Sequence, residues 1–124
     1  MPDNSAWHQF VVLEHDTRVG VHWDLMVESG EMLVTWQLSL APLKQRRKID
    51  AHRIFDHRLE YLEYEGPISH DRGKVAQWDR GRCQIIDSDA LRWQICFEGR
   101  RLRGRYCLQR ELDRVAWVLK QQRG

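Results

Sequence analysis

The sequence predicts a small all-β domain in which antiparallel strands form a barrel or a sandwich. Several short runs alternate apolar and polar side chains, which is the pattern of half-buried strands. Turn-forming pairs such as Arg80-Gly81, Ser88-Asp89 and Glu98-Gly99 separate these runs at short intervals. The 124 residues, 42% of them hydrophobic, are enough for a real core, so we expect one domain over residues 1–124.

The first half of the chain contains three predicted strands. Residues 8–14 (HQFVVLE) and 22–29 (HWDLMVES) are rich in β-branched and aromatic side chains, and a seven-residue connection with Gly20 joins them. Residues 32–40 (MLVTWQLSL) alternate again after a glycine turn. The second and third strands should therefore form an antiparallel hairpin.

The middle of the chain is less regular. Residues 43–51 are polar without a strand pattern, so they are expected to form a loop or one short helix. Extended structure is expected to resume over residues 59–64, and Gly66 and Pro67 then break it.

The second half predicts a meander of four more short strands. They are residues 74–79 (KVAQWD), 82–87 (RCQIID), 91–97 (LRWQICF) and 101–110 (RLRGRYCLQR). In residues 112–121, Leu112, Val115 and Leu119 have helical spacing, whereas Trp117 and Val118 favour a strand. Both alternatives stay open for this tail.

The composition indicates an ordinary soluble protein. The first ten residues lack a basic region followed by an apolar run, and no apolar run approaches the roughly 18 residues of a membrane span. We therefore expect a cytoplasmic protein that does not enter a membrane. Cys83, Cys96 and Cys107 are odd in number and widely spaced, which predicts buried reduced thiols.

The net charge is only +2, but basic residues are bunched. Such clusters can neutralise nucleic-acid phosphates, although a charged run is also the common composition of a solvated surface. The two clusters are Lys44, Arg46, Arg47 and Lys48, and Arg100, Arg101, Arg103 and Arg105. Most of the six tryptophans are expected to lie in the core.

Two histidines and an aspartate form the candidate metal site. His22 and Asp24 are two positions apart, so in a strand their side chains share one face. With His15 at the end of the preceding strand, two imidazoles and one carboxylate can converge as a metal triad with open positions. The same spacing fits a hairpin with polar residues on its solvent face, and spacing alone leaves both interpretations open.

Six sequence blocks together carry a family resemblance. They are FVVLEHD, HWDLMVES, residues 31–36, DHRLEYLEYEGPI, KVAQWDRG and FEGRRLRGRYCLQR, in this order over roughly residues 9–120. The chain resembles the 3′-phosphoesterase domain of bacterial DNA ligase D proteins and its free-standing relatives. The resemblance implies a small β-barrel that uses manganese to remove 3′-phosphates or 3′-ribonucleotides from DNA ends during break repair by non-homologous end joining, with a separate ligase or polymerase as partner.

The resemblance also implies roles for individual residues. His15, His22 and Asp24 match the family's metal ligands, and His57 and Tyr61 match a histidine and a tyrosine that lie at the phosphate. A divalent ion can polarise a phosphoryl oxygen, while the imidazole and phenol stabilise charge or protonate the leaving oxygen.

The chain departs from the family at the phosphate. Met26 stands where the family has a phosphate-contacting arginine, and Leu40 stands near the place of a second basic residue. Arg18, Arg58 and Arg72 are candidates to substitute for the missing arginine.

Three functions therefore stay open. The first is a metal-dependent phosphoesterase on DNA 3′ ends, which the five polar residues favour. The second, which Met26 favours, is a weakened or inactive relative that binds nucleic acid or a repair partner. The third is a metal enzyme acting on another phosphorylated molecule.

Overall fold

The computed structural model describes residues 6–111 and 115–122. In these residues the chain forms strands and one short 3₁₀ helix, η1, and no helix is long and apolar enough to cross a membrane. The elements are β1 (Trp7–Thr17), β2 (Gly20–Ser29), β3 (Met32–Leu38), β4 (Lys48–Arg58), η1 (Leu59–Leu62), β5 (Gly66–Pro67), β6 (Lys74–Ser88), β7 (Arg92–Gly99), β8 (Arg103–Arg110) and β9 (Trp117–Gln121).

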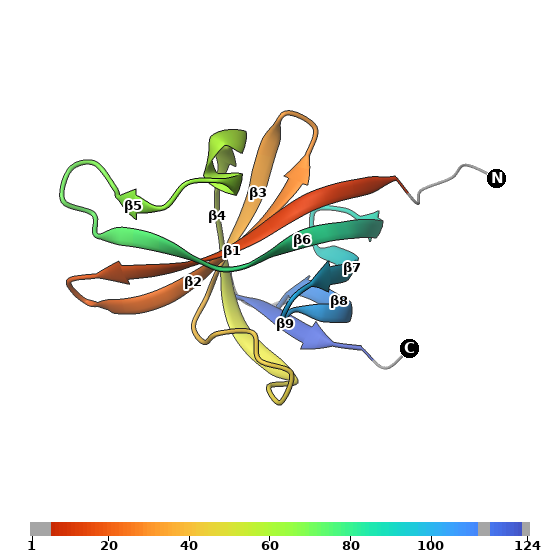
Figure 1. Cartoon of the computed structure of the whole chain (residues 1–124). Coiled ribbons are helices and arrows are strands. Elements are labelled where there is room, and N and C mark those ends of the chain that lie inside the picture. Colours follow the sequence, from red (N-terminus) through yellow and green to blue (C-terminus); the bar gives the residue numbers. More distant parts are fainter. Residues whose placement is uncertain (1–5, 112–114, 123–124) are drawn as a thin grey trace.

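The strands form one antiparallel sheet that closes on itself (Figure 1). Neighbouring strands follow the order β1-β2-β3-β4-β9-β8-β7-β6, and pairing between β1 and β6 completes the ring. The two-residue strand β5 adds to the end of β6. The all-β prediction is confirmed, and the ring is the closed antiparallel arrangement that the predicted barrel requires.

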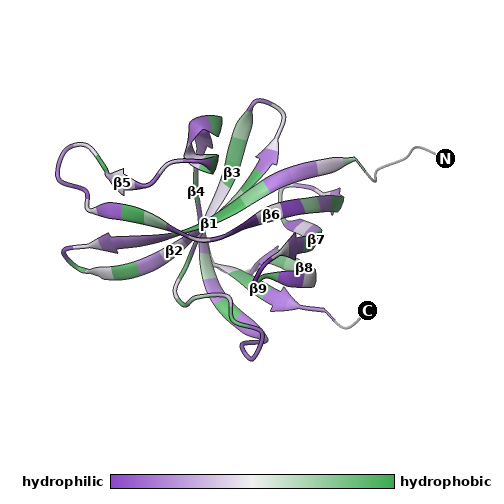
Figure 2. Ribbon diagram, in the orientation of Figure 1, coloured by the Kyte–Doolittle hydropathy of each residue, from purple (hydrophilic) through white to green (hydrophobic). Residues whose placement is uncertain are grey.

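The inner face of the ring holds the main core. Side chains from β1 to β4 and from β6 to β9 contribute to this core at alternate positions. Figure 2 shows the hydrophobic and hydrophilic segments that alternate along the strands. Trp36 is fully buried and makes edge-to-face contacts with Trp93 and Trp117, at centroid distances of 5.4 and 5.8 Å. Three of the six tryptophans thus lie in the core, and Trp23 and Trp78 pack against it partly buried, so most of the tryptophans belong to the core as predicted.

The cysteines are all free thiols, also as predicted. Cys83 and Cys107 are buried and Cys96 is half-buried. Burial raises the pKa of the Cys83 thiol to about 12, so this side chain stays protonated and behaves as a small apolar group.

A second apolar cluster lies on the outer face of the sheet. Val11, Leu13 and Met26 belong to it, and Leu62 of η1 packs over them. These positions alternate with the inward-facing ones on β1 and β2, so both faces of this hairpin are buried. The outer cluster holds η1 against the hairpin and thereby forms one wall of the pocket described below.

The prediction for the middle of the chain is wrong in two places. Residues 48–51 form the start of β4 and not a loop or helix, because they pair with β9 far along the sequence. The guanidinium of Arg53 points into the ring, 5.5 Å from the Trp36 ring centroid, and this inward cation breaks the expected apolar alternation. Residues 59–62 form a 3₁₀ helix and not extended structure. Side chains three positions apart lie on the same side of such a helix, so Leu59 and Leu62 both pack onto the outer cluster.

The second half of the chain contains one strand fewer than predicted there. Residues 74–79 and 82–87 belong to the single strand β6, and the predicted turn at Arg80-Gly81 does not form. Gly81 is instead a close-approach position: a Cβ there would overlap the carbonyl oxygen of Glu98 and lie 2.7 Å from the Cα of Gly99.

The structure also tests the predictions for the β1–β2 connection and for the tail. β1 and β2 extend to Thr17 and Gly20, so the connection between them is much shorter than the seven residues predicted. The tail forms strand β9 over Trp117–Gln121, which decides between the two alternatives there. Residues 112–114 lie outside the described residues.

Gly81→Ala is expected to lower the free energy of unfolding by about 2 to 3 kcal/mol, because β6 and β7 must move apart to admit the methyl group. Gly30→Ala is the control: φ is +64° and nothing lies within 4 Å of the added carbon, so about 1 kcal/mol of backbone strain is expected. Urea titrations followed by tryptophan fluorescence measure both values. Equal losses would contradict the close-approach role.

Candidate metal centre and pocket

The β1–β2 hairpin brings the three predicted metal ligands together. His15 of β1 lies directly opposite His22 of β2 in the antiparallel register, and Asp24 is two positions farther along β2 on the same face. One ligand atom from each residue lies within 4.8 Å of the others. The hairpin therefore presents two imidazoles and one carboxylate to a single point.

Asp24 is the centre of this cluster. Its Oδ2 lies 3.3 Å from His15 Nδ1, and its Oδ1 lies 3.1 Å from His22 Nε2. The carboxylate is only 5% exposed, whereas the two imidazoles are partly open to solvent. Each carboxylate oxygen thus faces a different histidine.

The donor set fits a divalent cation. His22 Nε2 and Asp24 Oδ1 are buried and lack a hydrogen-bond partner, although they face each other. His15 Nε2 donates to the backbone carbonyl of Arg72 at 2.7 Å, which leaves the His15 Nδ1 lone pair directed toward Asp24. A carbonyl that orients the far nitrogen of a ligating histidine is the usual arrangement at metal sites. Two imidazole nitrogens and a carboxylate oxygen suit manganese, iron or zinc.

The electrostatics of the cluster favour an ionised carboxylate. Burial alone would raise the pKa of Asp24, but the adjacent imidazoles of His15 and His22 outweigh it and hold this pKa below its ordinary value. The adjacent Asp24 carboxylate raises the pKa of His15 against the effect of burial. Asp24 therefore offers a negative charge to a cation, whereas His15 must give up its proton before it can act as a ligand.

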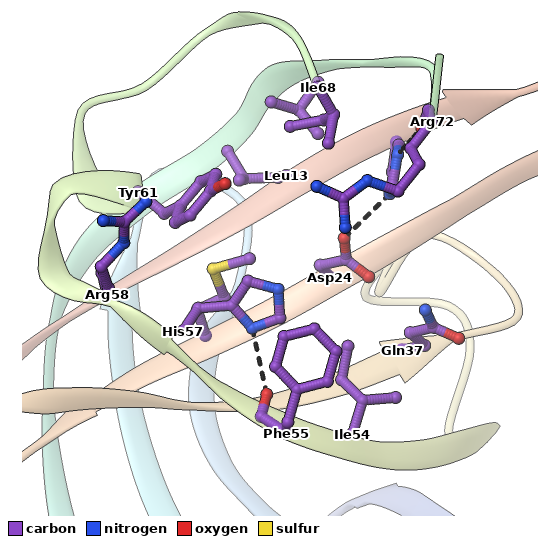
Figure 3. Close-up of a pocket in the computed structure, with 13 residues that line it drawn as sticks. Leu13, Asp24, Gln37, Ile54, Phe55, His57, Arg58, Tyr61, Ile68 and Arg72 are labelled. Atoms are coloured by element: carbon purple, nitrogen blue, oxygen red, sulfur yellow. Dashed lines mark hydrogen bonds and ion pairs between the residues drawn. The ribbon is translucent and has the colours of Figure 1, made fainter. Parts of the chain in front are cut away.

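A pocket of about 340 Å³ opens beside Asp24 and His15 (Figure 3). Its walls come from β1, β2, β3, β4, η1, β6 and the segment before β6. The polar residues at the pocket are His57, Tyr61, Arg58, Arg72 and Gln37, and the apolar ones include Leu13, Met26, Ile54, Phe55, Ile68 and Val75. The volume is in the range of small-ligand sites.

His57 and Tyr61 line this pocket together. The imidazole of His57 contacts the Tyr61 ring edge-on at 5.4 Å, and its Nδ1 donates to the carbonyl of Phe55 at 3.1 Å. Because Nδ1 carries the hydrogen, Nε2 holds the free lone pair. Burial lowers the pKa of His57, so the imidazole is neutral near pH 7. The two residues that the resemblance placed at the phosphate thus share one cavity with Asp24.

A family model, the DNA ligase D 3′-phosphoesterase domain, matches residues 13–110 of the chain. The chain belongs to this family. The matched segment includes all eight predicted site residues, from His15 to Arg72. No curated protein matches the chain in a direct sequence comparison.

The three arginines proposed to replace the family's phosphate-contacting arginine lie in different places. Arg18 pairs with Asp71 on the surface and does not line the pocket. Arg58 lines it, but pairs with Glu60 at 3.4 Å and lies beyond Tyr61 from Asp24 (Figure 3). Arg72 lines the pocket next to the metal cluster, where its carbonyl already holds His15.

Met26, at the position where the resemblance implies an arginine, is 2% exposed and lines the apolar side of the pocket. It is two positions from Asp24 on the same face of β2, as the alternation predicted. The pocket therefore has an apolar wall where the resemblance implied a cation.

The basic clusters lie elsewhere. None of their residues lines the pocket. In the first cluster, Arg46 donates to the carbonyl of Ala41. In the second, backbone N–H groups of Arg100 and Arg101 donate to the buried carboxylate of Asp79. The second cluster is thus built on a rigid turn between β7 and β8.

The sequence patterns missed Gln37, Ile54 and Phe55 as pocket residues. Gln37 pairs with Asp24 across the β2–β3 ladder, a neighbour that the predicted hairpin could have indicated. Ile54 and Phe55 belong to the part of β4 that had no predicted structure, so nothing local pointed to them.

One Mn²⁺ ion per chain is expected to bind in a calorimetric titration. Loss of a group that only hydrogen-bonds to a metal ligand lowers metal affinity about 10- to 100-fold. Loss of a ligand itself, in His22→Ala or Asp24→Asn, should therefore lower the Mn²⁺ affinity about 100-fold or more. His52→Ala is the control, since His52 is exposed and lies outside the cluster. Unchanged affinity in Asp24→Asn would rule out this site.

Proposed function

We propose that this protein is a metal-dependent phosphoesterase that removes a 3′-phosphate or a 3′-ribonucleotide from DNA ends in break repair. Its family supports hydrolase activity on 3′ ends of DNA. The observation that carries the proposal is the convergence of His15, His22 and Asp24 at the wall of a pocket that His57 and Tyr61 also line.

The metal ligands in this proposal are His15, His22 and Asp24. A divalent ion held by these residues, which we expect to be manganese, would supply the polarisation of a phosphoryl oxygen and a lowered pKa of water. The chain keeps Asp24 ionised and orients His15 through the carbonyl of Arg72, so the residues are arranged for the ion in advance.

In this proposal His57 is the general base and Tyr61 is the general acid. Hydrolysis forms a bond from a water oxygen to phosphorus and breaks the bond from phosphorus to the leaving oxygen. The free Nε2 of neutral His57 accepts the proton of the attacking water, and the hydroxyl of Tyr61 donates one to the leaving oxygen. The imidazolium then releases its proton to solvent and the phenolate takes one from solvent, which restores both groups.

Met26 supports an alternative, in which the protein is a weakened relative that binds DNA ends or a repair partner. An apolar side chain cannot donate to an oxyanion, and loss of such a preorganised donor typically costs about 100- to 1,000-fold in rate. The cluster around Asp24 favours the active phosphoesterase over this alternative. A buried carboxylate that faces two histidines lowers the stability of the fold, so it is not expected to persist without a function.

The biological setting is part of the proposal. After end processing, a ligase or polymerase must seal or extend the cleaned 3′ end, and such an enzyme is the proposed partner. The cytoplasmic location expected from the sequence stays a prediction.

The direct test is incubation with Mn²⁺ and a primer-template that carries a 3′-phosphate or a single 3′-ribonucleotide. End trimming that stops with EDTA and in His22→Ala supports the phosphoesterase. Metal-independent DNA binding without trimming would select the alternative.

Arg72→Ala is expected to lower kcat/KM on the 3′-phosphate substrate about 100-fold, because Arg72 is the arginine beside the metal cluster. Arg18→Ala should change it less than about threefold, since exposed ion pairs contribute little. Steady-state rates with Mn²⁺ measure both. A larger loss in Arg18→Ala would assign the phosphate contact to Arg18 in the β1–β2 turn.

Met26→Arg tests whether the phosphate subsite is weakened or rebuilt. If Arg72 has taken over, the added guanidinium is redundant and kcat/KM should stay within about threefold, with a loss of stability of about 1 to 3 kcal/mol from the buried position. Met26→Leu, similar in volume and uncharged, is the control. A gain of about 10- to 1,000-fold in Met26→Arg would instead identify a weakened site.

A further inference from the structure

Phe55 is an exposed aromatic side chain at the pocket. It is 72% exposed, yet it lines the same cavity as His57 and Asp24. Its ring lies nearly parallel to the imidazole of His57, with an interplanar angle of 13° and a centroid distance of 4.8 Å (Figure 3). A large apolar surface thus stands in solvent beside the proposed reaction centre.

The core does not account for this side chain. Phe55 belongs to neither of the two apolar clusters, although Ile54 and His57 beside it on β4 line the pocket. Leaving a phenylalanine in water forfeits about 1.5 to 3 kcal/mol relative to its burial. An exposed ring at a cavity is therefore a candidate contact for a ligand.

The strand that carries Phe55 also has room beside it. β4 pairs with β9 only from Lys48 to Ala51, and beyond Ala51 that edge of β4 has no partner strand in the described part of the chain. A ligand at Phe55 can therefore approach along this edge without displacing a strand.

The pocket's other walls indicate what kind of ligand reaches the ring. Asp24 and its histidines provide a cation site at one end, and Ile54 and Met26 provide apolar surface. A ligand that contacts both regions would place a phosphate at the cation site and would carry a flat, apolar group attached to that phosphate. A nucleotide has this combination, because its sugar and base extend from the phosphate.

We propose that Phe55 is a stacking platform for the base of the 3′-terminal nucleotide, with His57 beneath its other face. This inference rests on the proposed function and adds a base subsite to it. Stacking on an aromatic ring is tolerant of base identity, so the subsite takes any terminal base and rejects an abasic end. The platform also supports His57, whose Nδ1 donates to the Phe55 carbonyl.

Binding without turnover tests the platform. The probe is a DNA oligonucleotide that ends in 3′-phosphorylated 2-aminopurine, mixed with the full chain and Mn²⁺ and read before the first turnover. Wild type should quench the 2-aminopurine fluorescence through stacking, Phe55→Leu should not, and Phe55→Trp should restore quenching. The affinity of Phe55→Leu should fall about 5- to 150-fold, the range for one base on one aromatic ring.

A probe with an abasic end distinguishes two effects of Phe55→Leu: loss of base stacking and a change in the position of His57. With a tetrahydrofuran residue in place of the terminal nucleoside, wild type and Phe55→Leu should bind equally. Trp7→Leu is the matched control, since Trp7 is an exposed aromatic about 20 Å along β1 from Leu13 of the pocket. Equal losses on the base-bearing and abasic probes, or a similar loss in Trp7→Leu, would overturn the platform.

Failure of this inference and failure of the proposed function give different results. Trimming of 3′ ends that is equally fast on base-bearing and abasic ends keeps the phosphoesterase and removes the platform. Base-dependent binding that Phe55→Leu abolishes, without trimming under Mn²⁺, keeps the platform and removes the hydrolase.

Discussion

The antiparallel register of β1 and β2 is the constraint on which the site depends. It sets His15 opposite His22, and the alternation of side chains then places Asp24 on the same face. A slip of one residue would turn every side chain of one strand to the other face and separate the ligands. The register is held from both sides, because Leu25 and Val27 point into the core while Met26 packs under η1.

Burial of Asp24 connects this register to the chemistry. A carboxylate that is 5% exposed needs compensating partners, and the two adjacent imidazoles supply them and keep its pKa low. The carbonyl of Arg72 holds His15 from outside the hairpin, so the loop before β6 is part of the same assembly. The geometry of the proposed metal site is thus shared among β1, β2 and this loop.

The two halves of β4 have different roles, one in the closure of the ring and one in the pocket. Its first residues pair with β9 and help to close the ring, whereas its later residues carry Ile54, Phe55 and His57 to the pocket. Between them Arg53 points inward over Trp36. A strand that mixes a core arginine with exposed aromatic residues has no simple hydropathy pattern, because its positions serve a core, an edge and a pocket.

The sequence by itself determined the all-β class, the hairpin of β2 and β3, and the shared face of His22 and Asp24, because alternation and turn residues are local properties. The family's motifs indicated His57 and Tyr61. Only the tertiary structure decided that β6 is continuous through Gly81, that β4 is a strand, and that Arg72 and not Arg18 lies beside the metal cluster. Those features depend on partners far apart in sequence, whose contacts local patterns do not contain.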